Sequence, residues 1–266
     1  MTEQREEFRI RRILIAINAA ERTALGRAAA VRLAAELRVA LHGLFIEDVD
    51  LLRASGLPFT KEISLSGGKL RPLTLESMEQ SLKAMAEQLR NDLEERAHEA
   101  NITWSFDVRR ESFPRALIGA AEKEALVVIG PREASVNLGR ALRAKPYWPG
   151  AGPLIVLFDG RASSKRAVEV AIQIRRAIAR RIALHVFADD PDKTAKLVAQ
   201  AITVAGGPHS EARVEAIGLN TARDVLELAR RERASLILVG ADNTLLTEPD
   251  LRLFIERIEC PIGVVS

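Results

Sequence analysis

A carboxylate followed by a glycine ends a buried apolar run in the middle of the chain, in the stretch LIVLFDGRASSKRAVEVA at residues 154–171. Asp159 and Gly160 come directly after the run, and hydroxyl-bearing residues then lead into a helical apolar pattern. An aspartate at the carboxyl end of a parallel strand can contact a ligand, because open α/β sheets bind ligands at that edge. Aspartate and glycine also form tight turns without any ligand. The sequence leaves both interpretations open.

The same order of landmarks occurs near the N-terminus. The stretch ILIAINAAERTALGRAAA at residues 13–30 aligns with residues 154–171 and places Asn18 opposite Asp159. Two further pairs of matching positions follow in the same order: His42 with His185, and Gly130 with Gly240. The chain is therefore predicted to be a tandem repeat.

Runs of Val, Ile and Leu alternate with helical patterns along both halves, which predicts a parallel sheet covered by helices on both faces. The first half is predicted to contain strands 13–18, 39–46, 102–109 and 126–130 and helices 22–37, 75–100 and 113–123. The second half is predicted to contain strands 154–158, 182–187, 211–217, 235–239 and 261–265 and helices 163–180, 191–204, 221–233 and 249–258.

The helix over residues 75–100 has the clearest pattern, with apolar residues at three- and four-residue steps. Thr74 is a suitable N-cap, and Glu76 and Glu79 supply the acidic first turn that helices favour.

The two halves differ in one long segment. Residues 47–74 exceed the roughly 12–15 residues of ordinary loops, so a lid over the first ligand site, a binding loop or partial disorder is expected. Four apolar residues are expected to anchor its first part: Leu51, Leu52, Leu57 and Phe59.

The first half also lacks a fifth strand, because only a helical stretch at 133–144 and a Pro/Gly-rich stretch separate Gly130 from Leu154. This predicts four strands in the first half and five in the second, with a boundary near 145–153. The expected domains are residues 8–146 and residues 152–266.

Composition excludes several classes of protein. Apolar residues make up 47% of the 266 residues and charged residues 28%, which is ordinary for globular proteins. No apolar run approaches the roughly 20 residues that span a bilayer, and the N-terminus lacks a secretory apolar core. A single cysteine, Cys260, excludes an internal disulfide framework and fits a reducing compartment. We therefore expect a cytoplasmic protein without membrane insertion.

The net charge of +3 comes from 39 basic and 36 acidic residues, and the arginines are dispersed, several of them at predicted helix ends. Cations there offset the helix dipole. A nucleic-acid partner is therefore not expected.

These landmarks resemble the universal stress protein family. The resemblance rests on four motifs in family order: Asp159-Gly160, Leu184-His185-Val186, Leu236 to Gly240, and Cys260-Pro261-Ile262. It covers nearly the whole chain as a tandem pair. It implies an α/β fold of two tandem universal-stress-protein-like (adenine nucleotide alpha-hydrolase-like) three-layer sandwiches with parallel sheets, the first without its fifth strand. It also implies a monomeric pseudo-dimer or a homodimer.

Some members of this family bind ATP through a first-strand aspartate and a Gly-x-x-Gly-x9-Gly-Ser/Thr loop after the fourth strand. Glycines there let backbone N–H groups approach phosphates. This chain departs from the loop pattern in both halves, at Glu133, Arg143-Ala144, Asn243 and Leu253-Phe254, and Asn18 replaces the first-half aspartate.

The expected function is therefore that of a non-catalytic stress-response regulatory protein without high-affinity ATP binding, acting on a protein partner or a small anionic ligand. No cofactor is expected, and ATP is the one candidate. The alternative is an adenine-nucleotide-binding protein or weak nucleotide hydrolase that uses the second half. Nucleotide contacts would come from Asp159, Gly160, Val186 and Gly240, with Asn18 and Gly130 as first-half counterparts.

Other motifs do not favour an enzyme. SLSGGK at residues 64–69 fails as a Walker loop because Ile63 stands where that loop needs glycine. The histidines have no zinc-like i, i+4 spacing, so no metal site is expected. Cys260 reads as a packed residue before Pro261 rather than a nucleophile. An enzyme that uses residues 47–74 as an active-site lid stays the competing class.

Overall fold

The structure is a computed structural model. It describes residues 10–19, 24–57, 60–63, 70–121, 126–131, 152–186, 191–207, 209–217, 221–246, 253 and 256–266. Among these residues, no helix is long and apolar enough to cross a membrane.

The first half alternates strands and helices as its apolar runs predict. Its strands in the main sheet are β1 (Arg12–Asn18), β2 (Ala40–Asp48), β5 (Trp104–Glu111) and β6 (Leu126–Ile129). Its predicted helices are α1 (Ala24–Leu37), α3 (Leu75–Glu99) and α4 (Phe113–Ala121). A further helix, α2 (Val49–Ser55), lies in the segment that was predicted as a long loop. Thr74 caps α3 as predicted, because its side chain accepts from the backbone N–H of Ser77.

The second half repeats this alternation. Its strands are β7 (Leu154–Phe158), β8 (Ile182–Val186), β9 (Ala212–Ala216), β10 (Leu236–Gly240) and β11 (Ile262–Val265). Its helices are α6 (Ala162–Ile178), α7 (Pro191–Val204) and α8 (Ala222–Glu232), followed by a short 3-10 turn at Thr244–Leu246.

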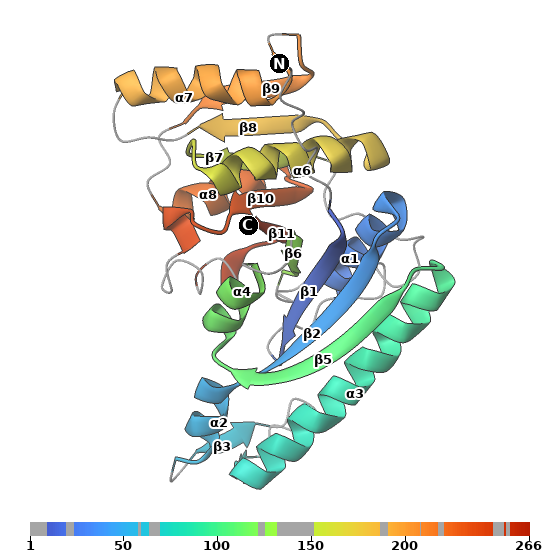
Figure 1. The fold of residues 1–266 in the computed structure, drawn as a ribbon. Coiled ribbons are helices and arrows are strands. Elements are labelled where there is room, and N and C mark those ends of the chain that lie inside the picture. The colour runs from blue at the N-terminus through green and yellow to red at the C-terminus, as the bar shows by residue number, and fades with distance from the viewer. Residues whose placement is uncertain are drawn as a thin grey trace.

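All nine of these strands form one sheet, in the order β5-β2-β1-β6-β11-β10-β7-β8-β9 (Figure 1). Read from each outer edge inward, the two halves have the same strand order, as a tandem repeat requires. The described residues of the first half supply four strands and those of the second half five, which agrees with the prediction.

The difference from the prediction lies in how the two sets of strands meet. They do not form separate sheets, because β11 pairs antiparallel with β6 and every other pairing within the sheet is parallel. A strand edge inside a protein needs hydrogen-bond partners. Strand β11 supplies them to β6, so the last strand of one half closes the inner edge of the other.

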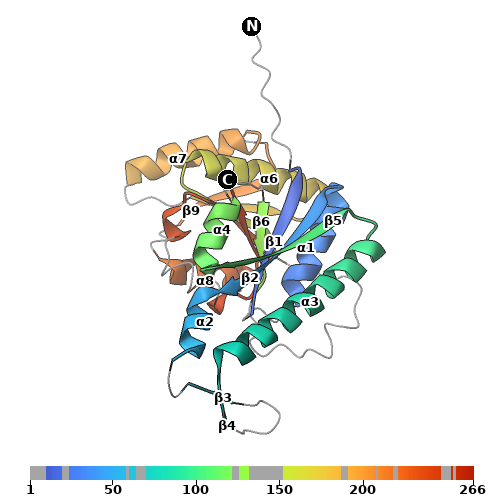
Figure 2. The same cartoon turned by 60° about the horizontal axis from the view of Figure 1, so that its bottom comes forward.

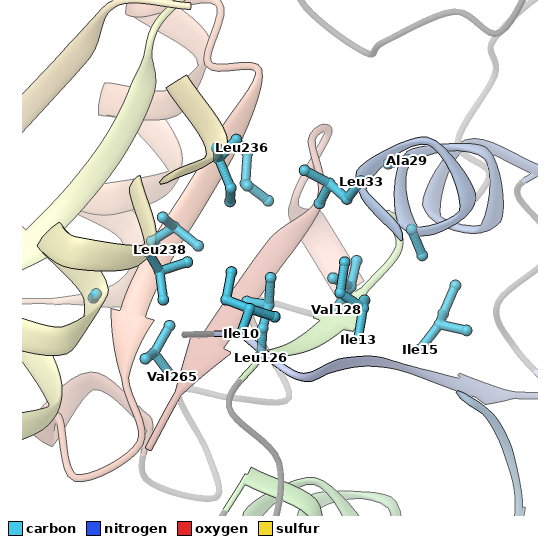
Figure 3. Close-up of a cluster of buried hydrophobic side chains, with 14 of the residues drawn as sticks. Ile10, Ile13, Ile15, Ala29, Leu33, Leu126, Val128, Leu236, Leu238 and Val265 are labelled. Atoms are coloured by element: carbon cyan, nitrogen blue, oxygen red, sulfur yellow. The ribbon is translucent and has the colours of Figure 1, made fainter. Parts of the chain in front are cut away.

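Helices cover both faces of the sheet. One face packs against α1, α3, α6 and α7, and the other packs against α4 and α8. Figure 3 shows side chains of both halves converging in the first of these cores. They include Ile13 of β1, Val128 of β6, Leu238 of β10 and Val265 of β11, all of them buried. The halves therefore share a hydrophobic core, while the predicted domain limits remain a prediction.

The described part of residues 47–74 has secondary structure of its own. It contains α2, whose N-cap Asp48 accepts from the N–H of Asp50, and a hairpin of β3 (Lys61–Ile63) and β4 (Leu70–Pro72). Helix α2 packs on α3 and β2, and the hairpin projects from the start of α3 (Figure 2). Residues 58–59 and 64–69 lie outside the described residues.

The anchoring prediction for this segment is confirmed in part. Leu52 is buried and Leu51 is partly buried against the core. For Leu57 the prediction is wrong, because its side chain is 62% exposed after α2 ends. Phe59 lies outside the described residues.

Candidate functional site

The second-half residues that the sequence singles out lie at the carboxyl ends of three adjacent strands. Strand β7 pairs with both β10 and β8, so Phe158, Gly240 and Val186 end three neighbouring strands. Asp159 and Gly160 follow β7 directly. Val186 is fully buried, and its carbonyl accepts from the N–H of Ile217 at 2.9 Å.

Asp159 has hydrogen bonds at both carboxylate oxygens. Oδ1 accepts from the backbone N–H of Arg161 at 3.1 Å, which forms a local turn before α6. Oδ2 accepts from the side-chain amide of Asn243 at 3.1 Å and lies 3.7 Å from the Arg161 Nε atom. The side chain of Asp159 is only 11% exposed. Each oxygen of its carboxylate therefore already accepts a hydrogen bond from the chain itself.

Gly160 and Gly240 are required by close packing. Gly160 has φ +83°, and a Cβ there would overlap the side chain of Leu197 in α7. A Cβ on Gly240 would overlap Ser163 and lie 2.9 Å from the backbone nitrogen of Ser164. The end of β10 thus packs directly against the first turn of α6.

Asp242 is a residue of this site that the sequence analysis did not single out. Its carboxylate accepts a hydrogen bond from the hydroxyl of Ser163, and its backbone carbonyl accepts one from the guanidinium of Arg161. The start of a helix favours an anion, and the carboxylate of Asp242 lies there. We refer to Asp159, Arg161, Ser163, Asp242 and Asn243 as the strand-end cluster.

In the first half, Asn18 ends β1, and Gly130 directly follows the neighbouring strand β6, which ends at Ile129, one residue before the predicted end. Asn18 is 8% exposed. Residues 20–23 and 132–151, which follow these two strand ends, lie outside the described residues. Any part of Asn18 and Gly130 in ligand binding therefore stays a prediction.

The two histidines are not at equivalent positions. His42 pairs with Leu14, four residues before the strand end at Asn18, whereas His185 pairs with Leu157, two residues before Asp159. The predicted equivalence is therefore wrong by two residues. Because side chains alternate between the faces of a strand, both histidines still lie on the face of the sheet that α4 and α8 cover.

His42 has polar neighbours on strand β5. Its Nδ1 atom is 2.7 Å from the hydroxyl of Ser105, and its Nε2 atom is 3.5 Å from a carboxylate oxygen of Asp107. The contact with Ser105 satisfies one ring nitrogen of this nearly buried side chain.

His185 lies in a second polar group, at the β9 edge of the sheet. Its side chain is fully buried. Among the described residues, Nδ1 has no hydrogen-bond partner, and Nε2 approaches Glu232 without well-aligned hydrogen-bond geometry. Its register partner on β9 is Glu215, and Glu232 ends the covering helix α8, with Oε1 3.3 Å from the Nε2 atom of His185. Arg213 completes the group. We call His185, Arg213, Glu215 and Glu232 the edge cluster.

The edge cluster contains two carboxylates, and both pair with the same guanidinium. Arg213 donates to Glu232 Oε1 at 2.7 Å, and its Nε atom is 3.2 Å from Glu215 Oε1. Burial lowers the pKa of His185 below its ordinary value of 6.5, against the opposing effect of Glu232 and Glu215. Neutral imidazole is therefore the favoured form at neutral pH. Spacing along the sequence gives no hint of this group, because its members come from three separate elements.

Cys260 is buried beside the end of the chain. Burial, with a smaller effect of Glu259, raises the pKa of its thiol to about 12. The thiolate needed for nucleophilic chemistry is thus suppressed at neutral pH.

Comparison with known proteins relates this architecture to solved structures. No protein-family model and no curated protein matches the sequence. A universal stress protein from Archaeoglobus fulgidus aligns over 97% of this chain and 99% of its own, with 14% identity and a TM-score of 0.55. A functionally unknown protein from Pseudomonas aeruginosa aligns over 96% of this chain and 92% of its own, with 15% identity and a TM-score of 0.45.

A shorter match covers about one half of the chain. A universal stress protein in complex with cAMP aligns over 43% of this chain and 97% of its own, with 17% identity and a TM-score of 0.34. The full-length match defines the class: the chain is an α/β protein with the fold of the universal stress proteins. The resemblance seen in the sequence is confirmed at the level of the fold.

Proposed function

We propose that this chain is a non-catalytic, stress-response regulatory protein of the universal stress protein type, and that it does not bind ATP tightly. The observation that carries the proposal is that polar groups of the strand-end cluster form hydrogen bonds with one another. Asp159 accepts from Arg161 and Asn243, and Asp242 accepts from Ser163. The biological effect of the protein would then come from binding a partner protein or a small anion.

Electrostatics support weak binding of a polyphosphate. The carboxylate of Asp242 already contacts Ser163 in the first turn of α6, where the helix dipole favours a negative charge. A triphosphate would have to displace this carboxylate or lie beside it, and like charges at such distances repel. The guanidinium of Arg161 donates to the carbonyl of Asp242 and lies 3.7 Å from Asp159, so part of its hydrogen-bonding capacity is already used within the cluster.

Asn243 supports the same conclusion through its side chain. It stands where ATP-binding members of the family have the second glycine of their loop. Asn243 is 4% exposed and donates to Asp159. The amide therefore fills space that a glycine would leave for the backbone to approach a ligand.

A non-catalytic role is supported by the state of the candidate nucleophiles. Ser164 donates to the carbonyl of Arg161, which cannot take up a proton as the base of a catalytic serine does. The raised pKa of the Cys260 thiol, about 12, argues against a thiolate nucleophile.

The test is calorimetric titration of the full chain with ATP, together with an assay of phosphate release. We expect a Kd no tighter than about 0.1–1 mM, equivalent to about −4 to −5.5 kcal/mol, and no release above background. The double variant Asp242→Gly/Asn243→Gly should bind ATP at least about tenfold more tightly, a gain of about 1.4 kcal/mol.

A third variant tests whether any gained ATP binding takes place at the strand ends. Adding Asp159→Ala to the double variant should remove the gained affinity if ATP enters at the strand ends. Submicromolar binding by the unmodified protein that Asp159→Ala abolishes would overturn the proposal. It would instead support the adenine-nucleotide-binding alternative, and phosphate release would extend it to a hydrolase.

A further inference from the structure

We propose that the edge cluster is a binding site for a divalent transition metal of the Zn²⁺ class, with His185, Glu215 and Glu232 as ligands. One ligand atom from each of these residues lies within 4.8 Å of the other two. The proposal does not depend on the function proposed for the strand-end cluster, because the two groups share no residue.

The first argument is the state of the His185 side chain. A buried polar atom normally has a hydrogen-bond partner, yet among the described residues the Nδ1 atom of this fully buried ring has none, and its Nε2 atom has only a poorly aligned contact with Glu232. The ring nitrogen Nε2 faces the carboxylate of Glu232. A metal ion between them would use the nitrogen lone pair and the carboxylate at the same time.

The second argument is geometry. A tetrahedral site with ligand bonds of about 2.0–2.2 Å separates its ligand atoms by roughly 3.3–3.5 Å. The Nε2 atom of His185 and the Oε1 atom of Glu232 are 3.3 Å apart. Glu215 is on the edge strand β9 with its side chain 42% exposed, so it can rotate to complete the set. Three protein ligands plus water are a common arrangement for zinc.

The third argument is charge. The two carboxylates already converge on one cation, the guanidinium of Arg213. Its side chain is 54% exposed, so it can move into solvent when a metal arrives. Two carboxylates neutralise one divalent ion, and the carboxyl end of α8, where Glu232 lies, also favours a cation.

The ligand set selects among metals. Imidazole together with carboxylates suits Zn²⁺ and related transition metals, whereas Mg²⁺ and Ca²⁺ prefer oxygen ligands alone. The same set would join β8, β9 and α8, and would fix the outer edge of the sheet.

The experiment titrates Co²⁺, a spectroscopic substitute for Zn²⁺, into chelator-treated full-length protein at pH 7.5. We expect one equivalent to give visible d–d absorption, Zn²⁺ to abolish it and Mg²⁺ to leave it unchanged. Glu215→Gln and Glu232→Gln should each weaken Co²⁺ binding at least about tenfold. Glu211→Gln is the matched control, because Glu211 is an exposed carboxylate near β9 that pairs with Arg175, and binding should not change.

Arg213→Gln separates a metal site from a purely structural ion-pair group. If the guanidinium competes with the metal, this variant should bind Co²⁺ more tightly than the unmodified protein. Weaker binding in Arg213→Gln, binding that survives both glutamate substitutions, or no d–d absorption would each overturn the proposal. The exposed Glu215 and Arg213 keep the test usable even where a substitution of buried His185 prevents folding.

Discussion

The two polar groups of the second half differ in whether their members satisfy one another. In the strand-end cluster, Asp159 and Asp242 both accept hydrogen bonds from neighbouring side chains or backbone. In the edge cluster, the ring of buried His185 has no well-aligned hydrogen bond among the described residues, although Arg213 pairs with both glutamates. A ligand would have to break contacts throughout the first group, whereas in the second it would displace the exposed guanidinium of Arg213 and add a contact to His185.

This difference shows that the site indicated by the family resemblance and the site indicated by hydrogen bonding in this chain are not the same. The family resemblance directs attention to Asp159 and its strand end, where relatives that bind ATP place a carboxylate. The unsatisfied buried group lies instead at His185, near the sheet edge. Buried groups that lack well-aligned hydrogen bonds in the folded chain therefore point to a different candidate site from the one that the motif positions indicate.

Metal addition is expected to have the largest effect on stability. Free Zn²⁺ at about 1,000 times its Kd should raise the free energy of unfolding by about 4 kcal/mol, because only the folded chain assembles the edge cluster. For a chain of this size that corresponds to a rise in Tm of roughly 10 °C, measurable by calorimetry. ATP at the same concentration should leave Tm nearly unchanged. A large rise in Tm with ATP and none with Zn²⁺ would mean that the ligand site is the strand-end cluster and not the edge cluster.

A side chain added next to the strand-end cluster should have the second-largest effect on stability. Gly240→Ala forces a Cβ into Ser163 and the start of α6, so the free energy of unfolding should fall by about 2–3 kcal/mol in a urea titration. Gly119→Ala is the control, because that glycine is inside α4 with open space around its Cβ position. It should be neutral or stabilising by about 0.5–1 kcal/mol, and equal losses in both variants would contradict close packing at Gly240.

Asp159→Ala should act on stability and not on nucleotide binding. It removes the acceptor of Arg161 and Asn243, and leaves the amide of nearly buried Asn243 with one partner fewer. We expect a loss of about 1–2 kcal/mol in the free energy of unfolding, with the weak ATP titration unaltered. A change in ATP affinity without a change in stability would argue that Asp159 is a ligand-contacting residue.

Arg213→Gln in metal-free protein should have the smallest effect. The side chain of Arg213 is 54% exposed, but that of its partner Glu232 is only 12% exposed. Gln keeps a hydrogen-bond donor, so the loss in the free energy of unfolding should be about 1 kcal/mol. A loss of several kcal/mol would mean that the guanidinium is an integral part of the edge cluster that a metal does not replace.

Local patterns predicted the elements well. The helix expected over residues 221–233 is α8, Ala222–Glu232, and Thr221 caps it through a capping box with Asp224. The strand expected over 154–158 is β7. These features depend on short-range apolar periodicity and on capping side chains, which are visible in any single segment.

The candidate site was predicted only in outline. Asp159, Gly160 and Gly240 do meet at adjacent strand ends, because parallel strands present their carboxyl ends at one edge. Asp242 was missed, since nothing in its local sequence shows that its carboxylate reaches Ser163. The edge cluster was missed because its members come from two strands and a helix, with no short spacing to reveal them.

By itself, the sequence determined the tandem repeat, the residues at the strand ends, and the order of strands and helices outside residues 47–74, where α2, β3 and β4 were not predicted. It did so because strand runs, helix faces and caps depend on neighbours a few residues away. Only the tertiary structure decided that β11 pairs with β6 to join the halves in one sheet, and that His42 and His185 sit two positions out of register. Pairing and register depend on contacts between distant segments, whose hydrogen bonds and side-chain packing are set only when the chain has folded.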